Sequence, residues 1–233
     1  MAGFQFKQFH VAHDRCAMKV GTDSIALGSW VRVGSARRIL DVGCGSGLLA
    51  LMLAQKASAG AFIEGIDIDL PAIAQARDNG AASPWSQQIA FYQSPVQSWR
   101  PTKSYDLIVT NPPYFPAGQS FEARRQQARH QGSLNLSELM ASVAQLLARD
   151  GTFWVVLPHT QQSELAQAAK DWRLCCYQQL RLRAQPHKPV SLVASAWGWQ
   201  DTPFSSKTLV IRDNDNQYTA AFRRLCRHYY LKF

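Results

Sequence analysis

The fold of this chain is decided by the stretch Arg38-Ile-Leu-Asp41-Val-Gly43-Cys-Gly45-Ser-Gly47-Leu-Leu-Ala. Its apolar residues at 39–42 are typical of a short buried strand, and those from 48 onward are typical of a helix. The three glycines between them allow a tight turn and let a ligand approach the backbone N–H groups at the start of that helix. We therefore expect a strand, a ligand-binding glycine loop and a helix in succession.

Beyond this stretch, short apolar runs continue to alternate with helical patterns. Near-continuous apolar strands separated by helices are typical of a mostly parallel sheet that is covered on both faces. We therefore expect an α/β fold with a doubly wound, mostly parallel, seven-stranded sheet. Its strands are expected at 39–42, 62–67, 89–92, 105–110, 152–157, 176–182 and 192–199, with helices at 47–54, 71–79 and 136–148.

The whole chain, residues 1–233, is expected to form one domain, because it shows no repeat, low-complexity tract or linker. A core at 38–200 is preceded by the segment 1–37 and followed by the tail 201–233, which is a polar loop with an end rich in Arg and Tyr that could be helical. Phe4, Phe6 and Phe9 could stack on nucleic-acid bases, but we expect them to anchor the first segment on the core.

The composition is that of a soluble globular protein, with 233 residues of which 46% are hydrophobic and 18% charged. No apolar run approaches the roughly 20 residues that a membrane span needs, and the start lacks the apolar core of a signal peptide. We therefore expect a cytoplasmic protein without a membrane partner. The five cysteines include no C-x-x-C pair and the histidines show no metal-ligand spacing, so we expect reduced thiols and no metal site.

The charge balance of the chain is basic. Lysine and arginine outnumber aspartate and glutamate by 25 to 16, which gives a formal net charge of +9. A positive surface favours a polyanionic partner through counterion release, and nucleic acid is the usual one. A basic surface without any specific partner fits the same numbers, so charge alone leaves both interpretations open.

A second candidate for ligand contact follows the strand expected at 62–67. Asp67 stands at its end, where a carboxylate is placed to accept both ribose hydroxyls of a bound nucleoside. Asp69 is instead expected to cap the helix that begins near Pro71. A G-x-G pattern with a following acid agrees with nicotinamide, flavin and S-adenosylmethionine cofactors alike.

The most informative stretch is Asn111-Pro112-Pro113-Tyr114, at the end of the strand expected at 105–110. An exocyclic amine on a heteroaromatic ring is a poor nucleophile because its lone pair is delocalised. Two acceptors that bind its hydrogens, here the Asn111 side-chain oxygen and the Pro112 carbonyl, can direct that lone pair toward an electrophile. The prolines stiffen the turn, and Tyr114 offers a face on which a planar group can stack. We therefore expect these four residues to form a catalytic site for chemistry at an amino group.

With both motifs in hand, the sequence resembles the class I methyltransferases that methylate amino groups. The pattern D-x-G-x-G-x-G at 41–47 is similar to their motif I, and Asn-Pro-Pro-Tyr at 111–114 is similar to their catalytic motif. The resemblance implies a Rossmann-like class I methyltransferase fold with S-adenosyl-L-methionine as the cofactor. The cofactor contacts that it implies are Asp41, Gly43, Gly45, Gly47, Asp67 and Asn111.

Within this class, the chain resembles the bacterial tRNA (adenine-N6)-methyltransferases that act on valine tRNA, essentially from end to end. The resemblance is carried by Phe-Lys-Gln-Phe at 6–9, Met-Lys-Val-Gly-Thr-Asp at 18–23, the stretch 125–130 and Arg-His-Tyr-Tyr-Leu-Lys at 227–232. It implies tRNA as the partner and methylation of the N6 amine of an adenosine at position 37, beside the anticodon. It also implies that the N-terminal segment folds over the cofactor, with Lys19, Gly21, Thr22 and Asp23 as contacts.

Other functions stay open at this point. Ribosomal-RNA guanine-N2 methyltransferases share the motif content. Release-factor glutamine-N5 methyltransferases also use Asn-Pro-Pro-Tyr, but they carry a substantial N-terminal helical domain for which 37 residues leave no room. A function of another class is a non-catalytic nucleic-acid-binding module that retains the fold.

The sequence departs from the class I pattern after the third strand. Many of these enzymes place there an acid that accepts a hydrogen bond from the adenine amine of the cofactor, but this chain has Pro95 at the corresponding position. A proline offers neither a carboxylate nor an N–H group. We expect Ser94, Gln93 or the Val96 N–H to hold the adenine instead, and of these we favour Ser94 and Val96 as the contacts.

Three groups of basic residues are expected to contact RNA phosphates and so to position the RNA rather than read its sequence. For any single residue, a solvated surface position is the simpler explanation. The groups are Arg124, Arg125, Arg129 and His130; Arg181, Arg183, His187 and Lys188; and Arg223, Arg224, Arg227, His228 and Lys232. From these, we select the first group and Lys188 as the substrate contacts.

Overall fold

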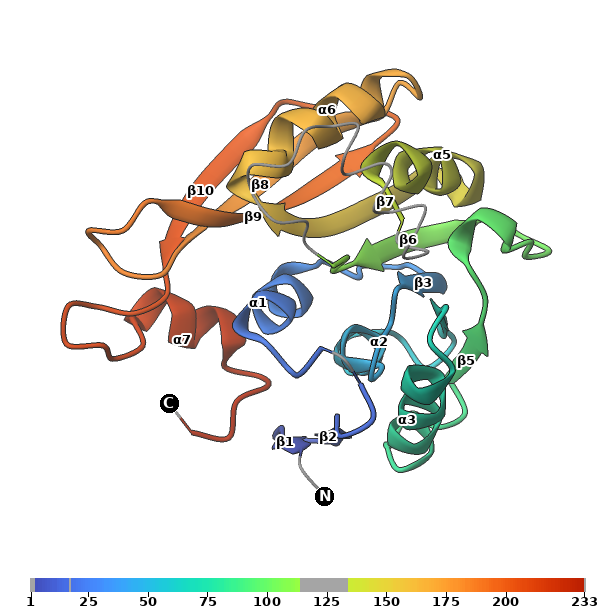
Figure 1. Cartoon of the computed structure of the whole chain (residues 1–233), viewed down its shortest axis with the longest axis horizontal. Helices are drawn as coiled ribbons and strands as arrows, with labels where there is room; N and C mark the ends of the chain where they lie inside the picture. Colours follow the sequence, from blue (N-terminus) through green and yellow to red (C-terminus); the bar gives the residue numbers. More distant parts are fainter. Residues whose placement is uncertain (1–2, 17, 114–133, 233) are drawn as a thin grey trace.

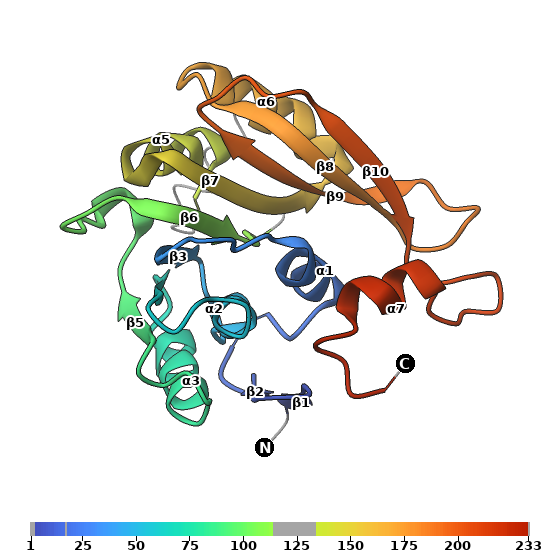
Figure 2. The same cartoon turned by 180° about the vertical axis from the view of Figure 1, so that it is seen from behind.

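The computed structural model describes residues 3–16, 18–113 and 134–232, in which a twisted sheet carries helices on both faces (Figures 1 and 2). The eight strands follow the order β10-β8-β9-β7-β6-β3-β4-β5. Only β9 runs antiparallel to its neighbours β7 and β8, whereas all other pairs are parallel. The strands are β3 (Arg38–Val42), β4 (Phe62–Asp67), β5 (Ile89–Gln93), β6 (Tyr105–Thr110), β7 (Leu147–Pro158), β8 (Cys175–Arg183), β9 (Val190–Gly198) and β10 (Ser205–Val210). The α/β fold with a mostly parallel sheet is therefore confirmed.

The helices form two layers, one on each face of the sheet (Figures 1 and 2). One layer holds α1 (Thr22–Trp30), α2 (Leu48–Ala54), α3 (Leu70–Ala81) and α7 (Ala220–Cys226), and the other holds α5 (Leu136–Leu146) and α6 (Gln162–Lys170). Short 3-10 turns, η1 (Val96–Ser98) and η2 (His159–Gln161), follow β5 and β7. Each layer buries its own hydrophobic cluster against the sheet, which is why the strands read as almost continuous apolar runs.

The sheet contains one strand more than the seven we expected. Residues 205–210 form β10, which pairs in parallel with β8 at the sheet edge. Its sequence, Ser-Ser-Lys-Thr-Leu-Val, is mostly polar because an edge strand is exposed along one side. The tail is thus a strand followed by helix α7 rather than a polar loop. The helix expected at 136–148 ends at Leu146, because the chain enters β7 at the next residue.

The segment before β3 is built into the core rather than lying on it. The strands β1 (Gly3–Gln5) and β2 (His10–Ala12) form an antiparallel hairpin, and the Lys7 N–H donates to the Tyr229 carbonyl at 2.9 Å. Phe6 and Phe9 are buried and stack with ring centroids 4.6 Å apart. The expectation that these phenylalanines anchor the segment is confirmed. Both ends of the described chain meet here on one side of the molecule (Figure 1).

Helix α1 is fixed at its end by a partly buried lysine in the turn after α2. The Lys56 Nζ donates to the carbonyls of Gly28, Ser29 and Val31 at 2.6, 2.9 and 2.8 Å. These carbonyls are among the ones that a helix end leaves without intrahelical donors, so Lys56 satisfies them directly. The end of α1 is thereby tied to the chain that follows α2.

Asn79 joins the N-terminal segment to the glycine loop. This buried side chain of α3 accepts from the Ala12 N–H at 3.0 Å and donates to the Ala12 carbonyl at 2.8 Å and to the Ser46 carbonyl at 2.9 Å. One amide therefore satisfies three buried backbone groups from two segments that are distant in sequence.

We predict that Asn79→Ala lowers the free energy of unfolding by about 2–4 kcal/mol, because it leaves those backbone groups buried without partners. Urea unfolding followed by circular dichroism measures the change. Gln88→Ala is the control: this half-buried side chain, before β5, donates only to the Ala59 carbonyl at 3.1 Å, and its loss should lower stability by less than about 1 kcal/mol. Equal losses in the two variants would contradict the role given to Asn79.

Candidate active site

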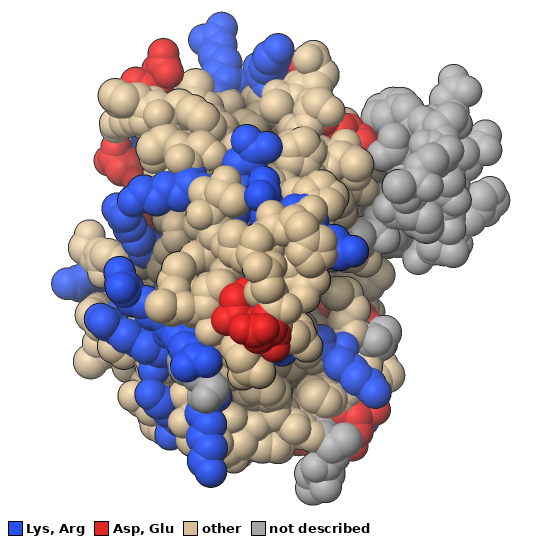
Figure 3. Space-filling model, turned by 90° about the vertical axis from the view of Figure 1, so that its left-hand side faces the viewer, with Lys and Arg blue, Asp and Glu red and all other residues tan. Residues whose placement is uncertain are grey.

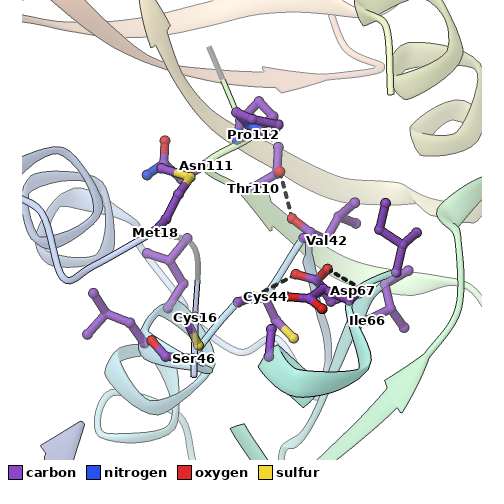
Figure 4. Close-up of a pocket in the computed structure, with 18 of the residues that line it drawn as sticks. Cys16, Met18, Val42, Cys44, Ser46, Ile66, Asp67, Thr110, Asn111 and Pro112 are labelled. Carbon is purple, nitrogen blue, oxygen red and sulfur yellow. Dashed lines mark hydrogen bonds between the residues drawn. The ribbon is translucent and has the colours of Figure 1, made fainter. Parts of the chain in front are cut away.

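A cavity of about 380 Å³ opens where β3, β4 and β6 end (Figure 4). Such a volume is typical of a site for a small molecule. Its wall is formed by the glycine loop, the end of β4, the chain after β5, residues 111–113 and residues 16–20 of the N-terminal segment, without Ala17. In Figure 4, Asn111 and Pro112 lie at one end of the cavity, and Cys44 and Asp67 lie at the other.

The register of the sheet explains why these segments meet. Val42 is paired with Ile66 on one side and with Thr110 on the other, so the three strands end at the same level. The next residues along the chain, at 43, 67 and 111, therefore stand side by side at the carboxyl edge. The Thr110 Oγ1 also donates to the Val42 carbonyl at 2.7 Å, which fixes the end of β6 to the end of β3, the strand that precedes the glycine loop.

The glycine loop has room for a ligand at two of its three glycines. Gly43 and Gly45 adopt positive φ angles of 67° and 52°, and a Cβ built on either would meet no atom within 4 Å. Both glycines line the cavity. Gly47 also has a positive φ, 80°, but its Cβ would lie 2.7 Å from the Phe91 ring. Gly47 therefore permits the packing of the loop on β5, whereas Gly43 and Gly45 leave open space at the cavity wall.

The carboxylate of Asp67 lies at the floor of the cavity. Its Oδ2 accepts from the Gly45 N–H at 2.8 Å, and its Oδ1 accepts from the Asp69 N–H at 3.0 Å. These bonds hold the carboxylate in one orientation against the loop. Asp69 takes the N-cap position of α3, as expected, but its side chain makes no capping hydrogen bond. The expectation of a side-chain cap is therefore wrong, and Asp69 lines the cavity instead.

Asp41 lies beneath the loop and is fully buried, so it does not line the cavity. Its Oδ2 accepts from the Ala50 N–H at 3.0 Å, which ties the strand end to α2. Burial, reinforced by the nearby Asp67 carboxylate, raises the pKa of Asp41 to about 7. Asp41 therefore supports the glycine loop rather than lining the cavity.

The two cysteines that line the cavity are neutral thiols at neutral pH. Burial and the carboxylates of Asp69 and Asp67 raise the pKa of Cys16 to about 11, and burial also raises the pKa of Cys44. Because the thiolate is the reactive form, neither thiol is activated for nucleophilic attack. In the described part of the chain there is also no cluster of three or more His, Cys, Asp or Glu side chains suited to hold a metal.

The wall after β5 is formed by Ser94, Pro95, Val96 and Gln97. The Ser94 N–H donates to the Asp67 carbonyl at 2.9 Å, and its hydroxyl donates to the Pro95 carbonyl at 3.1 Å. Gln97 donates from Nε2 to the Glu138 carboxylate of α5 at 3.3 Å. Gln93 donates instead to the Ile68 carbonyl at 3.1 Å and does not line the cavity. Of the adenine contacts considered, Ser94 and Val96 are thus at the wall and Gln93 is not.

The side chain of Asn111 is oriented by a hydroxyl from α1. Its Nδ2 donates to the Ser24 Oγ at 2.7 Å, and both residues line the cavity. Because the amide nitrogen points at Ser24, the amide oxygen is on the opposite side of the planar group. This geometry keeps the acceptor, rather than the donor, of Asn111 directed away from α1.

The structure brings together part of the predicted site. Residues Lys19, Gly43, Gly45, Asp67, Ser94, Val96, Asn111, Pro112 and Pro113 line the cavity. Gly21, Thr22 and Asp23 lie at the start of α1, and Lys188 lies in the turn between β8 and β9, all outside the cavity wall. Tyr114, Arg124, Arg125, Arg129 and His130 lie outside the described residues.

Sequence reasoning missed Ser24, Cys16, Met18 and Gln97 as lining residues. The signal for Ser24 was present, because it directly follows the Met-Lys-Val-Gly-Thr-Asp stretch at 18–23. Nothing in the sequence alone indicated that this hydroxyl meets Asn111, which is 87 residues away.

Comparisons with known proteins show the family to which the chain belongs. Residues 16–175 match the methyltransferase small domain family. A protein of Pectobacterium carotovorum named tRNA1(Val) (adenine(37)-N6)-methyltransferase is 44% identical over 232 residues, covering 98% of this chain and 94% of its own. A protein of the same name from Aeromonas hydrophila is 44% identical and covers 99% of this chain and 98% of its own.

The chain belongs to the tRNA1(Val) (adenine(37)-N6)-methyltransferase family. Solved structures agree on the fold of this family member. A predicted O-methyltransferase from Agrobacterium tumefaciens has a TM-score of 0.68 at 15% identity, covering 89% of this chain and 96% of its own. The glycopeptide N-methyltransferase MtfA, solved with S-adenosyl-L-methionine, has a TM-score of 0.54 at 13% identity, covering 80% of this chain and 93% of its own. The Rossmann-like class I methyltransferase fold is therefore confirmed.

We predict that Ser24→Ala lowers kcat of methyl transfer about fivefold while the dissociation constant for the cofactor changes less than threefold. The variant removes the acceptor that orients the Asn111 amide, and one hydrogen bond of this kind contributes about 1 kcal/mol. Steady-state kinetics and calorimetric titration of the cofactor measure the two quantities. Ser24→Thr retains the hydroxyl and should keep most of the rate. A normal kcat in the alanine variant would show that Asn111 does not depend on Ser24.

We also predict that Asp41 makes the stability fall as the pH rises. An unfolded aspartate has a pKa near 4, whereas burial raises that of Asp41 to about 7, so the folded state binds the proton more tightly. Its contribution to stability is complete below about pH 4 and is lost as the pH rises through 7. Urea unfolding should show that, between pH 5 and pH 8, the wild type loses about 2–3 kcal/mol more than Asp41→Asn. Parallel pH profiles would contradict the shift.

Proposed function

We propose that this chain transfers the methyl group of S-adenosyl-L-methionine to the exocyclic N6 amine of adenosine 37 in valine tRNA. The proposal rests on one observation above all, which is that Asn111-Pro112-Pro113 ends at the cavity that the glycine loop and Asp67 enclose. The names and near-complete coverage of the relatives at 44% identity support the choice of substrate. Such a substrate would place the reaction in the cytoplasm.

The residues present fit this cofactor. Gly43 and Gly45 leave open space where any side chain would project, which suits close approach of a ligand to the backbone. The Asp67 carboxylate is held by two backbone N–H groups and keeps further acceptor capacity for ribose hydroxyls. The apolar side chains of Ile66, Ile68 and Val96 line the same wall, where the flat face of an adenine can pack. When bound, S-adenosyl-L-methionine supplies an electrophilic methyl group on a sulfonium.

The residues of the chain then act on the amine. The Asn111 side-chain oxygen and the Pro112 carbonyl accept its two hydrogens, which turns the nitrogen lone pair toward the methyl group. Asn111 is 9% exposed, so this contact is made in a site that excludes most water. Ser24 holds the amide in the orientation that presents its oxygen. No residue forms a covalent bond with the substrate in this scheme: the amine nitrogen bonds to the methyl carbon as the carbon–sulfur bond breaks, S-adenosylhomocysteine leaves as a neutral thioether, and the nitrogen releases one of its two protons to solvent. Positioning supplies much of the rate.

Contacts to the rest of the cofactor and to the RNA complete the proposal. Lys19 lies at the cavity wall, and Gly21, Thr22 and Asp23 precede or begin the helix that carries Ser24. The exposed Lys188 is proposed as a phosphate contact.

We predict that Asn111→Ala abolishes methyl transfer, with a loss of at least about 100-fold in kcat, while the cofactor still binds. The assay incubates the protein and labelled S-adenosyl-L-methionine separately with total tRNA, ribosomal subunits and release factors, and then identifies the methylated nucleoside or residue. We expect N6-methyladenosine in valine tRNA only. Asn111→Asp is the companion variant, because it retains the acceptor but loses the donor to Ser24.

Three outcomes would contradict the proposal. Label recovered as N2-methylguanosine or as methylglutamine would assign the site to another amino group. Label in none of the pools would remove the enzymatic function. Undiminished activity of Asn111→Ala would remove Asn111 from the mechanism.

A further inference from the structure

The topology places a second set of functional groups at the same edge of the sheet as Asn111. The strands β6, β7, β8 and β10 run in one direction, because β9 is antiparallel to both β7 and β8, and β10 is parallel to β8. Their carboxyl ends therefore share one edge. Arg183 is the last residue of β8, Arg181 stands two residues before it, and Lys188 lies in the turn that follows. We call these three residues the edge cations.

The strands β6 and β7 point toward the left-hand side of Figure 1, and Figure 3 looks onto that side of the molecule. Lysine and arginine side chains are spread widely over it, and acidic side chains occupy only small areas (Figure 3). Lys188 is exposed, and Arg181 and Arg183 are partly exposed. An anionic ligand approaching the cavity from this side would therefore meet positive charge beside the catalytic residues.

The two arginines are held in place without being neutralised. The Arg181 guanidinium lies 3.4 Å from the Nε2 of His159, the first residue after β7. The Arg183 Nη1 donates to the Pro186 carbonyl at 3.1 Å, and its buried Nε has no hydrogen-bond partner among the described residues. Ordered guanidinium groups lose little further freedom when they bind phosphate in their fork geometry.

The absence of carboxylate partners distinguishes these cations from structural ones. Across residues 3–16, 18–113 and 134–232, the ion pairs are Arg15–Asp78 and Arg38–Glu64. Both lie away from β8. The positive charge of Arg181, Arg183 and Lys188 is therefore not neutralised by an ion pair within that part of the chain.

We propose that the RNA substrate lies along this carboxyl edge, from the methylated base at Asn111 across β7 and β9, with its backbone phosphates on Arg181, Arg183 and Lys188. The proposal rests on the proposed function for the identity of the RNA, and it adds the surface and the direction in which the RNA lies. The contacts are to phosphates and carry no sequence information.

The spacing of the sheet sets how far from the methylated base these contacts occur. In the strand order, β8 is three positions from β6, and neighbouring strands lie about 4.8 Å apart, so the edge cations begin about 14 Å from Asn111. A nucleic-acid strand in a helix advances about 3.4 Å per nucleotide. The phosphates in contact are therefore about four nucleotides from the methylated one rather than beside the target base.

The test compares two triple variants that remove the same charge at opposite ends of the sheet. The edge variant is Arg181→Gln, Arg183→Gln and Lys188→Gln. The control variant is Arg37→Gln, Lys103→Gln and Arg173→Gln, which are exposed residues just before β3, β6 and β8 at the amino edge. Binding of a valine tRNA transcript is measured at several salt concentrations, together with kcat and KM for methyl transfer and with binding of a five-nucleotide RNA centred on the target adenosine.

We expect the edge variant to bind the transcript at least about tenfold more weakly and to reduce the slope of log K against log salt by about 2–3 units, one for each phosphate contact. The KM for tRNA should rise by a similar factor while kcat and cofactor binding stay unchanged. Binding of the five-nucleotide RNA should not change, because it does not reach β8. The control variant should match the wild type.

Equal losses in the edge and control variants, or no loss in the edge variant, would overturn the proposal. A loss that affects the five-nucleotide RNA as strongly as the transcript would also overturn it, because the contacts would then lie beside the base. A failure of this proposal can be told apart from a failure of the proposed function, because binding and methylation are measured separately. If the wild type binds the transcript through the edge cations but methylates no adenosine, the docking surface stands and the activity fails.

Discussion

The constraint on which the rest of the structure depends is the common level at which β3, β4 and β6 end. Val42 pairs with both Ile66 and Thr110, so parallel hydrogen bonding alone brings residues 43, 67 and 111 together. A shift of one strand by a single residue would turn every side chain of that strand to the other face and move its end along the sheet. The apolar faces buried on both sides of the sheet oppose such a shift, because it would expose their side chains. Packing of the core thereby sets the position of the site.

Another part of the cavity wall comes from the N-terminal segment, which is held to the core by hydrogen bonds of its own. Asn79 ties β2 to the glycine loop, and Lys56 ties the end of α1 to the turn after α2. Between these two points the chain contributes Cys16, Met18, Lys19 and Ser24 to the cavity wall. The same segment therefore covers the proposed cofactor and orients the amide of Asn111. Both the wall of the cavity and the orientation of Asn111 therefore depend on the position of α1.

The sequence indicated most of the sheet because its central strands are buried on both faces and read as apolar runs. All seven expected strands are present; the bounds of β4 and β6 agree with expectation, and the ends of the others differ by at most five residues. The edge strand β10 was missed because half of its surroundings are solvent, which removes the apolar signal. Helix α1 was missed because its short sequence, Thr-Asp-Ser-Ile-Ala-Leu-Gly-Ser-Trp, has no helical periodicity of apolar residues and it precedes the first recognisable strand. These are the elements whose stability comes from tertiary packing rather than from local pattern.

The motifs gave the position of the site, but they did not separate residues that line it from residues that support it. Asp41, Gly43, Gly45 and Gly47 belong to one pattern, yet only the middle two face the cavity. Asp41 is buried below the loop, and Gly47 makes room for the Phe91 ring. This division depends on which way each residue points from a turn with alternating positive φ angles, and a sequence pattern does not contain that information.

The proline at position 95 changes which groups the wall of the cavity offers to a ligand. Pro95 cannot offer the carboxylate that this position has in many class I methyltransferases, but its carbonyl accepts from the Ser98 N–H and so begins the turn η1. That turn places Val96 and Gln97 at the wall, and Gln97 is held by Glu138 from α5. Because the Gln97 amide nitrogen is turned to Glu138, its oxygen is the atom left to face another donor. An amide oxygen can accept a hydrogen bond from an amino group as a carboxylate does, although without the charge that strengthens it. Recognition of the cofactor in the proposed reaction therefore relies more on Asp67 and on apolar packing than on an acid after β5.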